Sequence, residues 1–118
     1  MRVLRGLICI LLSMAVAGSA LALGSQPFIK SSFLNLKEDL AEATRRHRGL
    51  MIIYEQEGCP YCALMHKVNF ADRETVNLIT KHFDVVQLDT LGSREVVDLN
   101  GTAMTEKQLA VKLRAQYV

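Results

Sequence analysis

Two cysteines three residues apart, Cys59 and Cys62, follow closely on a short apolar run. That run, residues 50–54, has the length and the continuous apolarity of a strand buried in a parallel sheet. Pro60 directly after the first cysteine suits the first turn of a helix, where its missing N–H costs no hydrogen bond. The sequence therefore predicts a strand, a C-x-x-C motif at the start of a helix, and a helix that continues to Val68.

The residues before this unit predict another helix. Asn35 followed three residues later by Glu38 fits a capping-box-like start. Apolar residues recur after it with helical spacing, and Gly49 is a natural stop for the helix. The apolar strand at 50–54 would then follow this helix directly, with almost no loop between them.

The residues after the C-x-x-C helix continue the alternation. A break near residue 72 precedes a second amphipathic helix, which in turn precedes a short strand at 85–88. Asn100-Gly101 is the dipeptide best suited to a type I′ hairpin turn. Thr105 starts a second capping box, and Leu109, Ala110 and Leu113 give the last helix one apolar face. Strands that alternate with helices predict parallel strands, right-handed crossovers and an α/β fold.

The first 22 residues have the composition of a leader. Arg2 and Arg5 are their only charges, an apolar stretch follows, and Ala20-Leu21-Ala22 offers small residues for cleavage. An uncleaved membrane anchor is the alternative, because about 20 apolar residues can span a bilayer. We expect residues 1–22 to be a Sec-type signal peptide and residues 23–118 to be one domain.

The remaining residues 23–118 hold 12 basic and 12 acidic side chains, so their net charge is zero. No basic surface is left to favour a nucleic-acid partner. After cleavage only Cys59 and Cys62 remain as cysteines. In an oxidising compartment, a loop this short stabilises little by restraining the unfolded chain. The pair therefore indicates a redox or a metal site.

The expected helix start gives the two cysteines different roles. A free thiol has a pKa of about 8.5, and unsatisfied N–H groups at a helix N-terminus can bring it to about 7 or below. Cys59 is then the attacking thiolate, and Cys62 is the resolving thiol that breaks the mixed disulfide. Pro60 and Tyr61 between them would set the redox poise.

Three nearby side chains could tune this pair. Glu57 and Glu55 could accept a proton from Cys62, or could raise a thiol pKa by repulsion. The commoner alternative for such acids is a solvated loop. His66, one helical turn after Cys62, could also contribute, although a partly exposed surface histidine is the commoner case.

With these elements placed, the chain resembles the thioredoxin-like superfamily, and more narrowly the periplasmic thioredoxins of bacterial sulfur-oxidation (Sox) clusters. The narrower resemblance rests on FLNLKEDL at 33–40, EQEGCPYC at 55–62 and VVQLD at 85–89. It implies an exported thiol–disulfide oxidoreductase that acts on protein disulfides and is recharged by a membrane thiol–disulfide electron carrier. The redox pair would be Cys59 and Cys62. We expect no cofactor, no metal and, in the complete form, a monomer.

Two local departures from the family are visible. Cys-Pro-Tyr-Cys is the motif familiar from glutaredoxins, whereas ordinary thioredoxins have Gly-Pro between their cysteines. The position six residues before Cys59, an acid in ordinary thioredoxins, is Ile53. If a proton acceptor exists, Glu55 or Glu57 must supply it.

A third departure concerns the C-terminal side. The family continues into a Thr-Pro dipeptide with a cis proline, but the prolines of this chain are Pro27 and Pro60. We therefore expect a thioredoxin-like fold that is incomplete at its C-terminus, with a β-α-β core and preceding and following helices. The strand at 50–54 would then lack a neighbour on one edge.

Two other functions stay open at this stage. One is a truncated, non-catalytic remnant that keeps the motif. The other is a metal-binding module in which Cys59, Cys62 and His66 act as ligands. Structural zinc sites take four ligands, and the sequence shows no fourth near these three.

Overall fold

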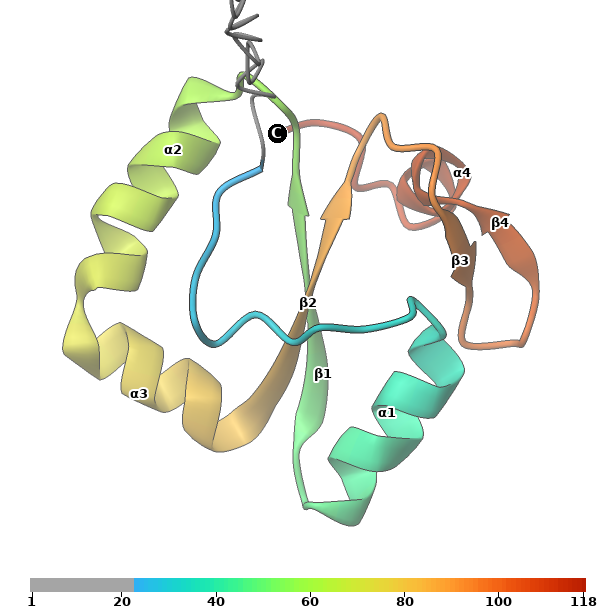
Figure 1. The fold of residues 1–118 in the computed structure, drawn as a ribbon, viewed down its shortest axis with the longest axis horizontal. Helices are drawn as coiled ribbons and strands as arrows, with labels where there is room; N and C mark the ends of the chain where they lie inside the picture. Colours follow the sequence, from blue (N-terminus) through green and yellow to red (C-terminus); the bar gives the residue numbers. More distant parts are fainter. Residues whose placement is uncertain (1–22) are drawn as a thin grey trace, which may run out of the picture.

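A pair of parallel strands, β1 (Gly49–Glu55) and β2 (Phe83–Asp89), forms the centre of the fold (Figure 1). The register runs from Gly49 opposite Phe83 to Glu55 opposite Asp89. This computed structural model describes residues 23–118, so the expected signal peptide at 1–22 lies outside the described residues. Both strands occupy the segments that the apolar runs predict.

The connection between the two strands is helical, as a parallel crossover requires. It consists of α2 (Pro60–Lys67), a 3-10 turn η1 (Asn69–Ala71) and α3 (Arg73–His82). Figure 1 shows α2 and α3 on one side of the strand pair, with the remaining elements on the other. Asp72 begins α3 by accepting a hydrogen bond from the Thr75 N–H, at 2.8 Å.

The first helix, α1 (Leu36–Arg45), begins where the sequence predicts. The Asn35 side chain accepts a hydrogen bond from the Glu38 N–H, at 3.2 Å, and so satisfies one of the free donors of the first turn. Acidic Glu38 and Asp39 in that turn also suit the positive end of the helix dipole.

The end of α1 differs from the prediction. The chain leaves the helix through His47, whose φ of 58° is left-handed, and the Arg48 N–H returns to the Ala43 carbonyl. This is a Schellman motif with histidine in the position that glycine usually takes. Gly49 is not the helix stop. It opens β1, where an added Cβ would approach the ring of Phe83 to 2.9 Å.

A small hairpin follows β2, made of β3 (Glu95–Val97) and β4 (Ala103–Thr105). The predicted type I′ turn is wrong, because that turn needs positive φ at two central residues. Gly101 has a φ of 86°, but Asn100 has no positive φ. The Asp98 carboxylate instead accepts hydrogen bonds from two loop N–H groups, at 2.8 Å each, and fixes a longer loop.

The last helix, α4 (Glu106–Lys112), has the predicted capping box, with Thr105 and Gln108 exchanging hydrogen bonds at 3.2 and 2.8 Å. Its predicted apolar face is only partly correct. Leu109 and Ala110 are buried, whereas Leu113 lies beyond the helix end and is 49 % exposed.

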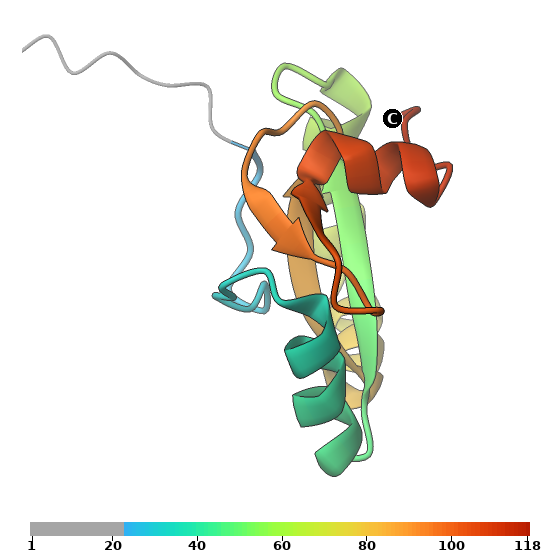
Figure 2. The same cartoon turned by 90° about the vertical axis from the view of Figure 1, so that its right-hand side faces the viewer.

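The core lies between the strand pair and the layer of α1, the hairpin and α4, which Figure 2 shows in front of the strands. Its buried members are Leu34, Leu36, Val86, Leu88, Val96 and Leu109. Within residues 23–118, β1 pairs with β2 alone. The segment before α1 crosses the outer side of β2, where Ile29 bridges to Val85. None of the described helices is long and apolar enough to cross a membrane.

Candidate redox site

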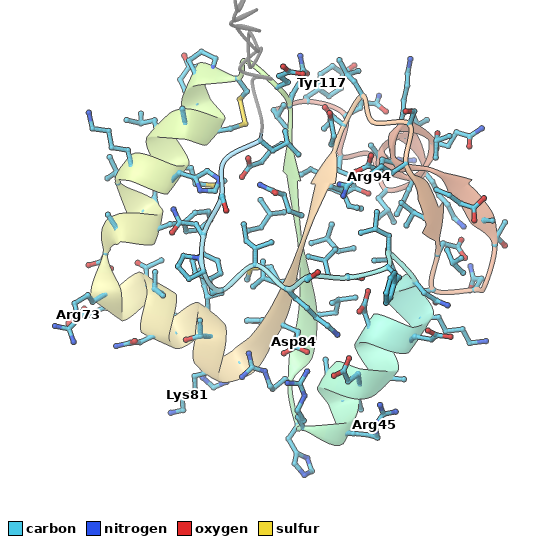
Figure 3. The ribbon with its side chains drawn as sticks, in the orientation of Figure 1. Arg45, Arg73, Lys81, Asp84, Arg94 and Tyr117 are labelled. Atoms are coloured by element: carbon cyan, nitrogen blue, oxygen red, sulfur yellow. A yellow bond between two sulfur atoms is a disulfide. The ribbon has the colours of Figure 1, made fainter. Side chains whose placement is uncertain are left out.

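Cys59 and Cys62 lie between the end of β1 and the first turn of α2. They form a disulfide, drawn as a yellow bond in Figure 3. Cys59 is the N-cap of α2, and Cys62 lies in its first turn. Their Cα atoms are 5.3 Å apart. This matches the prediction of a C-x-x-C motif at a helix start.

The turn before the pair is short and well fixed. The Cys59 N–H donates to the Gln56 carbonyl at 3.1 Å, which closes a turn around Gly58. Gly58 has a φ of 75°, a left-handed conformation that glycine adopts without steric cost. Pro60 then occupies the first helical position, as the sequence predicts.

The two cysteines differ in accessibility. Cys59 is half-buried, and exposed Pro60 follows it. Tyr61 is 78 % exposed. Cys62 is 9 % exposed and faces the protein. An incoming molecule therefore meets Cys59 first, which agrees with the roles expected from the helix start.

The two acids before the motif have opposite environments. Glu57 lies on the surface of the turn and is exposed, as a solvated loop acid is. Glu55 is the last residue of β1 and is 1 % exposed, so the solvated-loop interpretation is wrong for it. Glu55 is still part of β1 and points to the same face as buried Ile53, whereas Glu57 lies beyond the end of the strand, in the turn.

His66 is also more enclosed than a surface histidine. Its side chain is 10 % exposed, and its Nε2 contacts Glu55 Oε1. On the other side of the ring, Nδ1 lies 3.1 Å from the Gln26 amide nitrogen. The edge of the Phe70 ring completes the surroundings, with centroids 5.1 Å apart. The expectation of a partly exposed surface residue is therefore wrong.

The segment before α1 also reaches the site, and nothing in the sequence indicated this. The Gln87 side chain donates to the Gly24 carbonyl at 2.5 Å, which holds the segment against β2. A side chain at Gly24 would collide with the His66 imidazole, so glycine permits the close approach. A cleft of about 310 Å³ beside the disulfide is lined by residues that include Leu23, Gly24, Glu55, Cys59, Pro60 and Cys62.

The metal-binding alternative has no support in the described part of the chain. Residues 23–118 contain no group of three or more His, Cys, Asp or Glu side chains placed to hold a metal ion. His66 faces Glu55, and the two cysteines are bonded to each other.

Comparison with known proteins fits this geometry. A family model described as a thioredoxin-like domain matches residues 36–118, which is well over half of the chain. A search of curated proteins found no match. The matched region contains both strands, the crossover helices and the Cys59–Cys62 pair, whose disulfide fits a redox role. The chain therefore belongs to the thioredoxin-like family.

Proposed function

We propose that this protein is an exported thiol–disulfide oxidoreductase that exchanges electrons with protein disulfides through Cys59 and Cys62. The observation that carries the proposal is the asymmetry of the pair. A half-buried cysteine at a helix N-terminus is bonded to a second cysteine that is 9 % exposed. A thiolate at a helix start is a good nucleophile, and a buried neighbour can resolve its mixed disulfide.

Reduction of a substrate takes place in two exchanges. The Cys59 thiolate attacks one sulfur of the substrate disulfide, forms a mixed disulfide, and releases the other sulfur as a thiolate that takes a proton. The Cys62 thiolate then attacks the Cys59 sulfur, which releases the second substrate thiol. Two electrons pass to the substrate, and the protein is left with the Cys59–Cys62 disulfide seen here. The reverse sequence would oxidise a substrate dithiol.

The compartment and the partners are part of the proposal. The leader-like composition of residues 1–22 supports export to a periplasm. The similarity to the periplasmic thioredoxins of Sox clusters supports a role in sulfur oxidation and a membrane thiol–disulfide carrier as the recharging partner. In this setting the substrates are disulfides on other exported proteins.

Turnover of a protein disulfide tests the function. The protein should accelerate dithiothreitol-driven reduction of a disulfide-bonded protein, and Cys59→Ser should abolish the acceleration. A wild-type rate no faster than that of Cys59→Ser would overturn the proposal. If the Cys59 thiol nevertheless reacted with small alkylating agents, the result would identify a member of the family that keeps the motif without the catalysis.

The export component has its own test. The protein recovered from a periplasmic fraction should begin near Leu23, just after Ala20-Leu21-Ala22. A mature product that begins at Met1 and sediments with membranes would show a retained anchor in place of a cleaved signal peptide.

A further inference from the structure

We propose that the N-terminal segment, residues 23–28, helps to form a side-chain binding site beside the disulfide. This site selects substrates that carry an apolar residue next to the reacting cysteine. The inference rests on the proposed function, because it names the class of protein disulfide that reaches Cys59. The residues to which it assigns substrate selection are Leu23 and Gly24.

Side-chain contacts hold the N-terminal segment against the redox helix and the turn after it. The ring of Phe28 packs edge-on against Phe70 of η1, with centroids 5.2 Å apart. Two residues earlier, the Gln26 amide nitrogen lies 3.1 Å from Nδ1 of His66 on α2. Because both partners belong to the same crossover as Cys62, these contacts fix the segment relative to the disulfide.

Gly24 determines how closely the segment approaches α2. Its carbonyl accepts a hydrogen bond from the Gln87 side chain on β2, at 2.5 Å. A Cβ at position 24 would collide with the imidazole of His66, so a larger residue would have to move the segment or the ring. The position of the segment therefore depends on glycine at this residue.

The segment and the redox turn line one cleft of about 310 Å³. Leu23 and Gly24 contribute to it from the N-terminal segment, and both cysteines contribute from the redox turn. Several other lining residues are small or apolar, namely Gly58, Pro60 and Ala63. A lining of this kind suits an apolar side chain of a ligand.

The polar side chains of the lining are already engaged with other protein groups. The Glu55 carboxylate contacts His66, and Gln56 Oε1 accepts a hydrogen bond from the Thr90 hydroxyl at 3.5 Å. A polar ligand side chain that entered the cleft would lose water and gain few hydrogen bonds in return. The cleft therefore favours apolar over polar side chains.

The reacting disulfide lines this cleft, and its chemistry identifies the occupant. A mixed disulfide brings the substrate sulfur to about 2.05 Å from the Cys59 sulfur. The neighbours of the substrate cysteine are then only about 3.8 Å further along the substrate chain. A flanking side chain thus reaches the cleft, where an apolar one buries surface against Leu23.

Cysteine peptides activated with thionitrobenzoate test the site in a single exchange. In Cys62→Ser of the processed protein, the Cys59 thiolate attacks the peptide sulfur and forms a mixed disulfide. Thionitrobenzoate leaves as a thiolate, and its absorbance gives the rate. A Gly-Leu-Cys-Leu-Gly peptide with blocked ends should react about 10-fold faster than Gly-Ser-Cys-Ser-Gly, because only its flanking residues bury apolar surface. With β-mercaptoethanol in place of the protein, the two peptides should react at equal rates.

Substitutions in the segment, made in the Cys62→Ser background, test its part in the preference. Leu23→Ser removes the apolar side chain, and Gly24→Ala forces the segment away from His66. Each should lower the preference below about threefold and leave the rate of the serine peptide within about twofold. Leu78→Ser is the matched control, because Leu78 of α3 is 62 % exposed and does not line the cleft. If Gly24→Ala does not fold, Leu23→Ser decides the question.

The outcomes separate this inference from the proposed function. Equal rates for the two peptides in Cys62→Ser, or an unchanged preference in Leu23→Ser, would overturn the binding site and leave the redox function in place. Equal slowing of both peptides in Leu23→Ser would also overturn it, because the effect would then be on the thiolate. Reaction of Cys62→Ser with either peptide no faster than that of Cys59→Ser would overturn the redox function itself.

Discussion

The sulfur of Cys59 accepts a hydrogen bond from the backbone N–H of Cys62, at 3.1 Å. This contact is the ordinary N-cap interaction of a helix, made here by a sulfur atom in place of a hydroxyl or carboxylate oxygen. In the reduced protein the same N–H group, together with the positive end of the dipole of α2, would stabilise negative charge on Cys59. Among residues 23–118, no backbone N–H donates a hydrogen bond to the Cys62 sulfur, whereas the Cys59 sulfur has one.

This asymmetry predicts different reactivities for the two thiols. With Cys62→Ser, the remaining Cys59 should react with iodoacetamide at pH 6 at least about 10-fold faster than Cys62 does in Cys59→Ser, because it has the larger thiolate fraction. Cys62→Ser should also accumulate mixed disulfides with protein partners. Equal alkylation rates in the two single variants would contradict the assignment of Cys59 as the nucleophile.

The end of α1 predicts a stabilising substitution. His47 holds a left-handed φ of 58°, which costs a residue with a Cβ about 1–2 kcal/mol. His47→Gly should therefore raise the free energy of unfolding by about 1 kcal/mol, measured by urea denaturation. Gly49→Ala is the matched comparison. It should destabilise the protein, because its Cβ would press against Phe83. Loss of stability in His47→Gly would be inconsistent with the Schellman ending.

Because the pKa of Asp98 is lowered, we expect the protein to lose stability at acid pH. The Lys112 ammonium beside Asp98, followed by the Thr102 N–H, holds the pKa of the Asp98 carboxyl below its usual value. A lowered folded-state pKa gives stability that is present above about pH 4 and is lost as the pH falls through the folded value. Asp98→Asn should be less stable than wild type at pH 7, and the difference should shrink as the pH falls below about 4. A difference that stays constant from pH 7 to pH 2.5 would contradict this. Glu95→Gln, at an exposed position of the same hairpin, is the control.

Because the pKa of Tyr54 is raised, we expect stability to be lost at alkaline pH. Burial, and then the negative charge of Glu106, raise the pKa of Tyr54 from 10.0 to about 12. A raised folded-state pKa gives stability that is complete below pH 10 and is lost as the pH rises through 12. Tyr54→Phe should remove the absorbance change near pH 12 in a spectrophotometric titration. Tyr54→Phe should lower the free energy of unfolding only slightly at pH 7. The buried hydroxyl that it removes has no hydrogen-bond partner in the described part of the chain. A loss of about 2 kcal/mol or more would mean that the hydroxyl has a partner.

Several features could be predicted from the sequence because they depend on residues close together in the chain. The caps at Asn35 and Thr105 are made by side chains that reach a backbone N–H three residues away. Pro60 at the first helical position follows from an equally short pattern. The parallel pairing of β1 and β2 follows from the alternation of strands and helices along the chain. The same holds for the redox motif, whose disulfide joins two residues of one helical turn.

Local patterns were misleading where a more distant group competed with them. Asn100-Gly101 favours a two-residue turn, but the Asp98 carboxylate binds the loop N–H groups and stabilises a longer one. Gly49 suits a helix end, yet the chain turns earlier at His47 and keeps Gly49 for the close approach of Phe83.

The sequence by itself determined the order of the helices and strands, the helix caps and the redox pair, since each depends on a few consecutive residues. The tertiary structure alone decided the surroundings of that pair. Glu55, His66 and Gln26 lie on a strand, a helix and the segment before α1, and their contacts exist only once these three pack together. Burial is a property of that packing. It distinguishes Glu55 from Glu57 even though both are glutamates within four residues of Cys59.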